Sequence, residues 1–111
     1  MAKDARKITD IVSRYRQELQ RLNIRSEKII LFGSYAEGRQ RQDSDIDLIV
    51  VSNDFQPFNV RERLEVLGLA SGRILEPIEA FGYTPKEIES ATSESFLWDV
   101  LHTKTSIEIS L

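Results

Sequence analysis

Hydrophobic residues recur along the N-terminal half with two different periods, and the change of period marks the expected elements. Residues 4–22 carry apolar positions at helical intervals opposite a face of Lys, Arg, Gln and Glu, which predicts an amphipathic helix packed on a sheet: Ile8, Ile11, Val12, Tyr15, Leu19 and Leu22. Residues 29–32 form a short apolar run rich in branched side chains, which indicates a buried strand. Residues 45–51 then alternate, with Ile46, Leu48 and Val50 on one face and Asp45, Asp47, Ile49 and Val51 on the other.

A polar segment joins these two predicted strands. Gly33 ends the first strand, and Ser34 is expected to cap one helical turn over residues 35–37, which Gly38 closes. Residues 39–44 are polar and predict a loop. The chain therefore passes from strand to strand through a short turn of helix and a loop.

The C-terminal half predicts a helix, a strand, a helix and a terminal strand. Residues 53–59 read as a loop, and the helix from Val60 is expected to stop at Ser71-Gly72. Residues 73–81 contain Pro77, which predicts an edge or bulged strand, and residues 82–85 predict a turn. Thr84, with Pro85 and Glu87, has the pattern of a helix start. The helix that follows is expected to direct five side chains inward: Ile88, Phe96, Leu97, Val100 and Leu101. Residues 106–111 alternate and suggest a short terminal strand or coil.

This order predicts an α+β fold (α/β-like), a small mixed sheet flanked by helices, in one domain over residues 1–111. Hydrophobic residues make up 41% and charged residues 30%, a globular rather than a disordered composition. No apolar run approaches the ~20 residues of a membrane span, and the polar N-terminus is unlike a secretory signal, so we expect a cytoplasmic protein.

The composition also excludes several kinds of chemistry. Cys is absent, which excludes thiol chemistry, and His102 is the sole histidine, so a zinc site built on His and Cys is not available. The formal net charge of −3 argues against direct nucleic-acid binding through broad electrostatic attraction. Carboxylates are therefore the main candidates for chemistry, and they need divalent cations before they can hold a polyanion.

Asp45 and Asp47 stand two positions apart on a predicted strand, so both side chains leave the same face, roughly 6.7 Å apart at ~3.3 Å per residue. Their oxygens can converge on one metal ion or on two neighbouring ions. Carboxylate ligands suit Mg²⁺ or Mn²⁺. Two like charges at the rim of a hydrophobic strand are costly unless a cation neutralises them, which is the physical reason to expect a metal.

Gly33 and Ser34 supply the features of a phosphate site. Glycine has no side chain to keep a phosphate from the backbone N–H, and Ser34 adds a hydroxyl donor beside a helical turn with free N–H groups. A nucleoside triphosphate could place its terminal phosphates here and its metals on Asp45 and Asp47.

Other metal or phosphate motifs fit this stretch less well. The opening of an EF-hand loop matches Asp43, Asp45 and Asp47, but Leu48 takes the glycine position and Asp54 the position of the final Glu. A P-loop has the glycine spacing of this stretch but requires Lys followed by Ser or Thr, where this chain has Arg39-Gln40. Ordinary strand-start carboxylates account for either Asp alone, but less well for the whole constellation.

The combined pattern resembles the minimal nucleotidyltransferases, the smallest branch of the DNA polymerase β-like superfamily. The residues that carry the resemblance are Gly-Ser, a turn ending in Gly, a loop and Asp-x-Asp before aliphatics: Gly33-Ser34, Gly38 and Ser44-Asp45-Ile46-Asp47-Leu48-Ile49-Val50. The resemblance implies that Asp45 and Asp47 bind two catalytic Mg²⁺ ions, with Mn²⁺ as a substitute. It also implies that Gly33 and Ser34 bind the triphosphate of ATP or another NTP.

The family usually adds a third carboxylate on a later strand. Glu79, in Ile78-Glu79-Ala80-Phe81, fits that context best as a metal ligand and proton acceptor, and Glu76 is the alternative. Family members often have a basic residue before Gly38, where this chain has Glu37. Arg39, with Arg41, would restore that charge at the triphosphate, unless both are ordinary solvated loop arginines.

The resemblance further implies a role. Minimal nucleotidyltransferases are commonly antitoxins paired with a small helical HEPN toxin, and some transfer AMP from ATP to a toxin tyrosine. We therefore expect NMP transfer to a hydroxyl acceptor supplied by such a partner, because the chain has no room for an acceptor domain. Two alternatives remain open: a catalytically weak domain that neutralises its partner by binding alone, and a small-molecule nucleotidyltransferase acting as a homodimer.

Overall fold

The computed structural model describes residues 5–41, 44–103 and 105–109. The elements follow in this order: α1 (Ala5–Arg21), β1 (Lys28–Phe32), α2 (Gly33–Glu37), β2 (Ile46–Val51), the 3₁₀ helix η1 (Asn53–Phe55), α3 (Val60–Ile74), β3 (Ile78–Tyr83), α4 (Pro85–Glu89), α5 (Phe96–Leu101) and β4 (Ile107–Ile109). The predicted α+β organisation with a mixed sheet is confirmed. Five positions of predicted elements lie outside the described residues: 4 in the first helix, 42–43 in the loop, and 110–111 in the tail.

The strands form one sheet in the order β3-β2-β1-β4. Strand β1 pairs antiparallel with both β2 and β4, whereas β2 pairs parallel with β3. A parallel pair needs a crossover connection, and α3 provides it. This topology places β2, with its two aspartates at the start, between the end of β1 and the start of β3.

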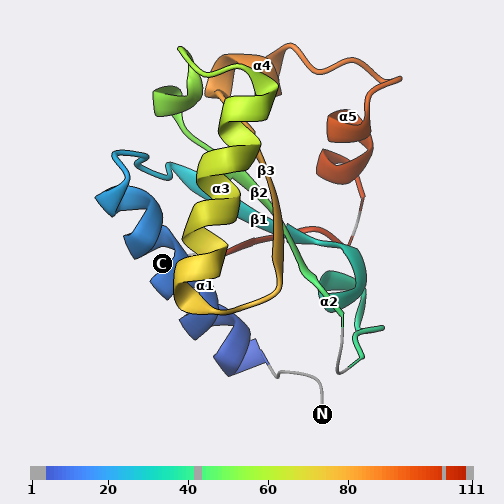
Figure 1. The fold of residues 1–111 in the computed structure, drawn as a ribbon. Coiled ribbons are helices and arrows are strands. Elements are labelled where there is room, and N and C mark those ends of the chain that lie inside the picture. The colour runs from blue at the N-terminus through green and yellow to red at the C-terminus, as the bar shows by residue number, and fades with distance from the viewer. Residues whose placement is uncertain (1–4, 42–43, 104, 110–111) are drawn as a thin grey trace.

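Figure 1 shows α1 and α3 side by side on one face of the sheet and α5 on the other. The larger core lies under α1 and α3 and takes Ile46, Leu48 and Val50 from β2. The smaller core takes Ile49 and Val51 of β2 and packs them against α5. The alternation predicted for this strand is therefore confirmed. In the part of the chain that the structure describes, every helix is too short or too polar to cross a membrane.

Helix α3 is longer than predicted. It continues through Ser71-Gly72 and ends at Ile74, with Leu75 in the left-handed conformation at φ 55°. A glycine inside a helix costs only about 1 kcal/mol relative to alanine, so packing of α3 on the sheet overrides it. The predicted strand over residues 73–81 was therefore wrong at its start, and β3 begins at Ile78. Its position at the edge of the sheet was predicted correctly.

The region after β3 also departs from prediction in part. Gly82 and Tyr83, expected in a turn, complete β3. The predicted helix start is confirmed, because Thr84 forms a reciprocal capping box with Glu87 and Pro85 opens α4. The single helix expected after it is two, since the Ser- and Thr-rich residues 90–95 interrupt it before α5. Phe96, expected to face inward, is 49% exposed.

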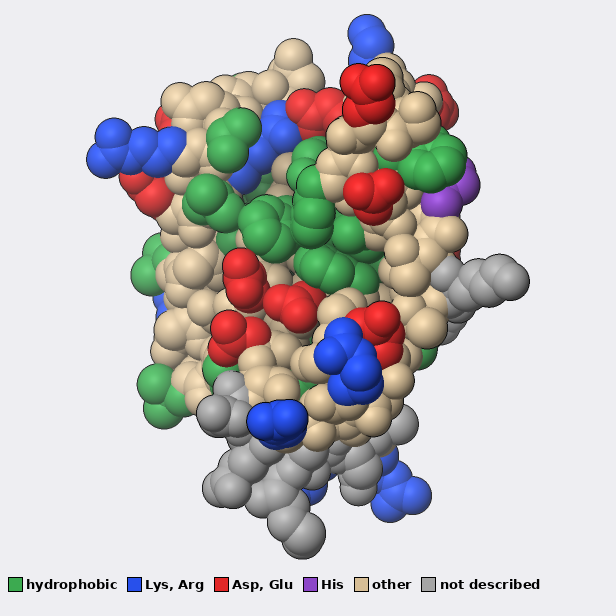
Figure 2. All heavy atoms as spheres, turned by 90° about the vertical axis from the view of Figure 1, so that its right-hand side faces the viewer, with side chains coloured by type: hydrophobic (Ala, Val, Ile, Leu, Met, Phe, Trp, Pro, Cys, Tyr) green, Lys and Arg blue, Asp and Glu red, His purple; other side chains and the backbone are tan. Residues whose placement is uncertain are grey.

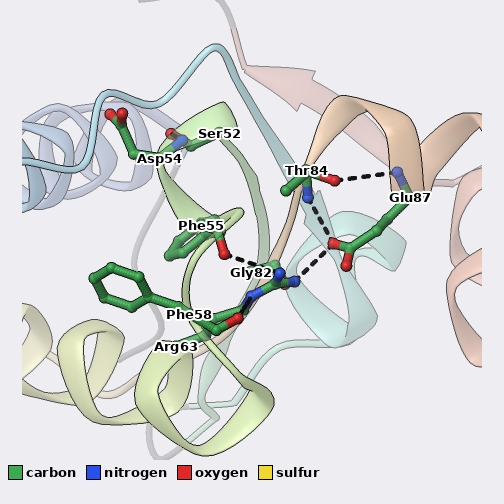
Figure 3. Close-up of polar contacts among 8 residues, drawn as sticks. All are labelled: Ser52, Asp54, Phe55, Phe58, Arg63, Gly82, Thr84 and Glu87. Carbon is green, nitrogen blue, oxygen red and sulfur yellow. Dashed lines mark hydrogen bonds and ion pairs between the residues drawn. The ribbon is translucent and has the colours of Figure 1, made fainter.

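The side chain of Arg63 holds together the segments around the end of β3 (Figure 3). Its guanidinium donates hydrogen bonds to three backbone carbonyls and one carboxylate: Phe58 O at 3.0 Å, Phe55 O at 2.9 Å, Gly82 O at 3.2 Å and Glu87 Oε1 at 2.6 Å. The group also lies 5.7 Å from the centre of the Phe55 ring. Burial tends to raise the pKa of Glu87, but its hydrogen bonds with Arg63 and Thr84 hold that pKa below its ordinary value.

Replacing Gly82 by alanine should destabilise the protein by about 1–3 kcal/mol, because the new Cβ would lie 2.8 Å from the Phe55 ring. Gly68→Ala is the matched control, since Gly68 lies in α3 with open space at the Cβ position. That change should stabilise the protein by up to about 1 kcal/mol. Urea unfolding measures both, and equal stability of the two variants would contradict the close contact at Gly82.

Candidate active site

Three neighbouring strands bring the predicted site residues together at one end of the sheet. Phe32, the last residue of β1, pairs with Asp47 of β2, and Asp47 pairs with Glu79 of β3. Gly33 follows Phe32 directly, and Asp45 precedes the first residue of β2. Asp47 is therefore the centre of the group, with Gly33 on one side and Glu79 on the other.

Gly33 lies against the carboxylate of Asp47. A Cβ atom added to Gly33 would stand 2.1 Å from Asp47 Oδ2, and the residue has φ +73°, where side chains other than glycine are strained. Two independent features thus require glycine here, and the backbone of the turn is open to the carboxylate. The structure brings these two predicted residues into direct contact.

The turn after Gly33 differs from the prediction at its start. Helix α2 begins at Gly33 with Phe32 in the capping position and no capping side chain, so the prediction of Ser34 as the cap is wrong. The left-handed Gly33 turns the chain one residue earlier and places Ser34 inside the first turn. The predicted closure at Gly38 is correct, because Gly38 has φ 73° and its N–H donates to the Ser34 carbonyl.

The carboxylates influence one another electrostatically. Burial, the charge of Glu79 and the charge of Asp45, in that order, raise the pKa of Asp47 from 3.8 to about 6. A positive ion between these groups would relieve the repulsion between them. The donor set therefore fits a divalent cation.

The three carboxylates do not by themselves form a complete set of metal ligands. Within residues 5–41, 44–103 and 105–109, no group of three or more His, Asp or Glu side chains is arranged to hold an ion. Mg²⁺ is commonly held by one or two carboxylates, with waters and substrate phosphates completing its shell. Asp45 and Asp47 are two such carboxylates, and Glu79 lies next to Asp47 in the register.

Glu79 and Glu76, the alternatives for a third carboxylate, occupy different surroundings. Glu79 is exposed on β3 beside Asp47, whereas Glu76 precedes the strand and accepts a hydrogen bond from Arg14 Nη2 of α1 at 3.0 Å. The geometry favours Glu79 as the neighbour of the aspartates.

The two loop arginines differ in their contacts. Arg39 is 67% exposed at its side chain and forms an ion pair with Glu37, so part of its charge is already balanced. Arg41 is exposed, and its backbone N–H donates to Ser44 Oγ at 2.8 Å. A role for Arg39 at a triphosphate would require it to exchange Glu37 for a phosphate oxygen.

A groove that sequence reasoning missed lies next to the carboxylates. It has a volume of about 470 Å³, with β3, α3 and the segment around α4 and α5 as its walls, and its apolar lining includes Val60, Leu64, Phe81, Tyr83, Phe96 and Leu97. Phe81 stands two positions after Glu79, so both leave the same face of β3. Figure 2 shows a hydrophobic patch immediately above a group of acidic side chains.

Three phenylalanines from separate elements pack against one another, and two of them, Phe81 and Phe96, line the groove. The ring centres of Phe81 and Phe96 are 5.4 Å apart, and that of Phe32 lies 5.7 Å from Phe96 and 6.4 Å from Phe81. Each residue belongs to an apolar stretch that predicts core, so a groove lined by Phe81 and Phe96 was not expected. The groove could have been suspected from the spacing of Glu79, Phe81 and Tyr83, which occupy every second position of β3 and so share one face.

The pKa of Asp47 predicts a pH dependence of stability. The pKa of Asp47 in the folded protein is about 6, above the ordinary value of 3.8, so a protonated Asp47 favours the folded state. This contribution to the free energy of unfolding is fully present below pH 4 and is lost as the pH rises through 6. Solvent screening at this half-buried group limits the effect to about 1 kcal/mol. Urea unfolding at pH 5 and pH 7.5 should show the loss in the wild type without divalent cations and its absence in Asp47→Asn. If the free energy of unfolding changes with pH equally in both proteins, repulsion at Asp47 is not the cause.

Comparisons with known sequences identify the family of this chain. The sequence profile of the nucleotidyltransferase domain family matches residues 12–108. A protein of Methanocaldococcus jannaschii, provisionally named a protein adenylyltransferase, is 42% identical over 43 residues, which make up 39% of this chain and 49% of that protein. The match thus spans about half the length of that relative.

Solved structures share the fold. A provisionally assigned nucleotidyltransferase from Sulfolobus solfataricus superposes with a TM-score of 0.53 at 17% identity, over 97% of this chain and 89% of the other. A toxin–antitoxin structure with AMP-PNP gives a TM-score of 0.57 at 22% identity, over 92% of this chain and 72% of the other. With the family profile covering most of the sequence and the fold matching throughout, the chain belongs to the nucleotidyltransferase domain family.

Proposed function

We propose that this protein is a Mg²⁺-dependent nucleotidyltransferase that moves AMP from ATP, or NMP from another NTP, to a hydroxyl group of a partner protein. The observation that carries the proposal is the position of Asp47, pressed against Gly33 and paired in register with Glu79. Repulsion within the group suits a cation-bound triphosphate.

In this proposal Asp45 and Asp47 hold the metal, with Glu79 as the third carboxylate. A Mg²⁺ ion held there would supply positive charge to neutralise the triphosphate. Gly33 leaves its backbone N–H accessible, and Ser34 offers a hydroxyl to the terminal phosphates. Glu79 accepts the proton of the attacking hydroxyl. The hydroxyl oxygen forms a new bond to the α-phosphorus, and the bond to the β-phosphate oxygen breaks to release pyrophosphate.

We propose further that the acceptor is a tyrosine of a small helical HEPN-type toxin, which this protein would neutralise as an antitoxin. The toxin–antitoxin structure that shares this fold supports the pairing. The groove supports a protein acceptor, because its apolar lining begins two residues beyond Glu79 on the same strand face. An acceptor bound there would reach the carboxylates.

Incubation with α-labelled ATP, Mg²⁺ and the candidate toxin tests the activity. We expect label on the toxin, loss of label with chelator, and no effect of Asp10→Asn, which changes an exposed carboxylate on α1. Absence of label at all metal concentrations would overturn the transferase proposal. If the toxin is still neutralised by Asp45→Ala and Asp47→Ala proteins without label transfer, the protein acts by binding alone. Label on a small hydroxyl compound instead would indicate a small-molecule enzyme.

Leu64→Glu should abolish labelling of a protein acceptor while leaving nucleotide binding unchanged, because Leu64 lines the groove. Leu69→Glu is the matched control: Leu69 lies on the same helix, is 50% exposed against 46% for Leu64, and is outside the groove. Labelling of the acceptor and calorimetry with ATP and Mg²⁺ measure the two effects. Equal labelling by both variants would place the acceptor elsewhere.

A further inference from the structure

A second hollow with a distinctive lining lies at the opposite end of β1. It has a volume of about 220 Å³ and is lined by Arg16, Gln20, Arg25 and Ser26. All four side chains can donate hydrogen bonds, and none is acidic. An all-donor lining stands out in a chain whose formal net charge is −3.

The donors of this hollow have no partners among the residues that the structure describes. Ser26 is 7% exposed, and its hydroxyl is buried without a hydrogen-bond partner. The guanidinium groups of Arg16 and Arg25 form no ion pair with a described residue. A buried polar group without a partner is rare and calls for a ligand or water to satisfy it.

The nearby carboxylates are engaged elsewhere. Asp54 accepts the backbone N–H of Arg25 at 2.8 Å, and Glu27 accepts that of Asn53 at 2.7 Å. Glu108 pairs with Lys28 at 3.4 Å in an adjoining hollow of about 240 Å³, which Arg16 and Ser26 also line. The contact with Asp54 fixes the loop that carries Arg25 and Ser26 without neutralising the guanidinium.

We propose that this hollow is an anion site that binds a phosphate group. Two guanidiniums from different segments, an amide and a buried hydroxyl present donors from several directions, which suits a tetrahedral phosphate better than a carboxylate with two oxygens. The five residues of β1 separate the hollow from Gly33 by roughly 17 Å at ~3.3 Å per residue. The site is therefore distinct from the triphosphate site near Asp47.

Titration of ¹⁵N-labelled protein with inorganic phosphate, in the presence of chelator, tests the proposal. We expect saturable shifts of the Arg25 and Ser26 amide signals. Arg16→Gln and Arg25→Gln should each weaken binding about tenfold, as expected for loss of a charge-assisted hydrogen bond. Arg61→Gln is the matched control, because Arg61 is exposed on α3 and pairs only with Glu65 among the described residues. Asp47→Asn should bind phosphate as the wild type does, which separates this site from the proposed transferase site.

Titrations with two other compounds define the ligand. AMP in place of inorganic phosphate shows whether a monoester is accepted, and equal or tighter binding would assign the site to small phosphate esters. Acetate binding as tightly as phosphate would overturn the phosphate assignment. Absence of saturable shifts, or equal binding by wild type and Arg16→Gln, would overturn the site itself. Ser26→Ala should retain the fold and weaken phosphate binding, because it removes a hydroxyl that has no protein partner.

Discussion

Asp47→Asn should lower the rate of nucleotidyl transfer by about three orders of magnitude. A metal at a reacting phosphate contributes several kcal/mol to transition-state stabilisation, and ~1.36 kcal/mol corresponds to a factor of ten in rate. The amide keeps the shape of the side chain next to Gly33 but removes the charge that would hold the metal. Single-turnover assays with labelled ATP and excess protein measure the effect.

The same assay distinguishes the two glutamates. Glu79→Gln should lower the rate by roughly ten- to a thousandfold, because Glu79 lies beside Asp47. Glu76→Gln should leave the chemical step unchanged, since Glu76 bonds to Arg14 of α1. A larger loss in Glu76→Gln than in Glu79→Gln would reverse the assignment, and full activity of Asp47→Asn would remove the carboxylates from the mechanism.

Arg63→Met should destabilise the protein by about 3–5 kcal/mol, the cost of removing one partner from a buried charged network. The loss leaves three backbone carbonyls without their donor and Glu87 without its cation. Arg61→Met, two residues earlier on the same helix, removes an exposed pair with Glu65 and should change stability by less than about 0.5 kcal/mol. Urea unfolding of the two variants measures the contrast.

A second variant distinguishes loss of the Arg63 hydrogen bonds from general damage to α3. Arg63→Lys keeps the charge but cannot make all four hydrogen bonds, so its stability should fall between wild type and Arg63→Met. Stability of Arg63→Met within about 1 kcal/mol of wild type would mean that the carbonyls of Phe55, Phe58 and Gly82 find other donors.

Asp47 thus has opposite effects on stability and on the proposed activity. We expect the carboxylate to make the metal-free protein less stable at neutral pH, because burial and neighbouring charges oppose its ionisation. In the proposed mechanism the same charge holds the cation. A variant selected for stability alone would lose this carboxylate. Such a trade-off between stability and activity is common at functional sites.

The sequence predicted those parts of the fold that depend on local periodicity. The two faces of β2 and the capping box at Thr84 follow from side-chain spacing, and both were correct. Glu79 was expected as a third carboxylate only through the family resemblance, and its pairing with Asp47 was not predicted, because periodicity does not fix which strands are neighbours. The register of β2 with β3 depends on the length of the α3 crossover, which packing determines.

Errors arose where tertiary packing outweighed a local signal. Gly72 predicted a helix end, but α3 lies on the sheet and continues for two more residues. No local pattern pointed to Arg63, whose side chain donates hydrogen bonds to four acceptors from three segments of the fold. The groove was missed because Phe81 and Phe96 have the composition of a core, and only their arrangement in space exposes them.

The sheet order also predicts the order in which the strands pair during folding. Strands β1 and β2 are joined by a short connection, whereas β3 joins β2 only after the whole of α3 has crossed the sheet. Contacts between positions close in the chain generally form before distant ones. We therefore expect amides of β1 and β2 to gain protection before those of β3 in pulsed hydrogen exchange. A newly made chain would then hold Gly33 and Asp47 together before Glu79 arrives, so the candidate site would mature with the docking of the edge strand.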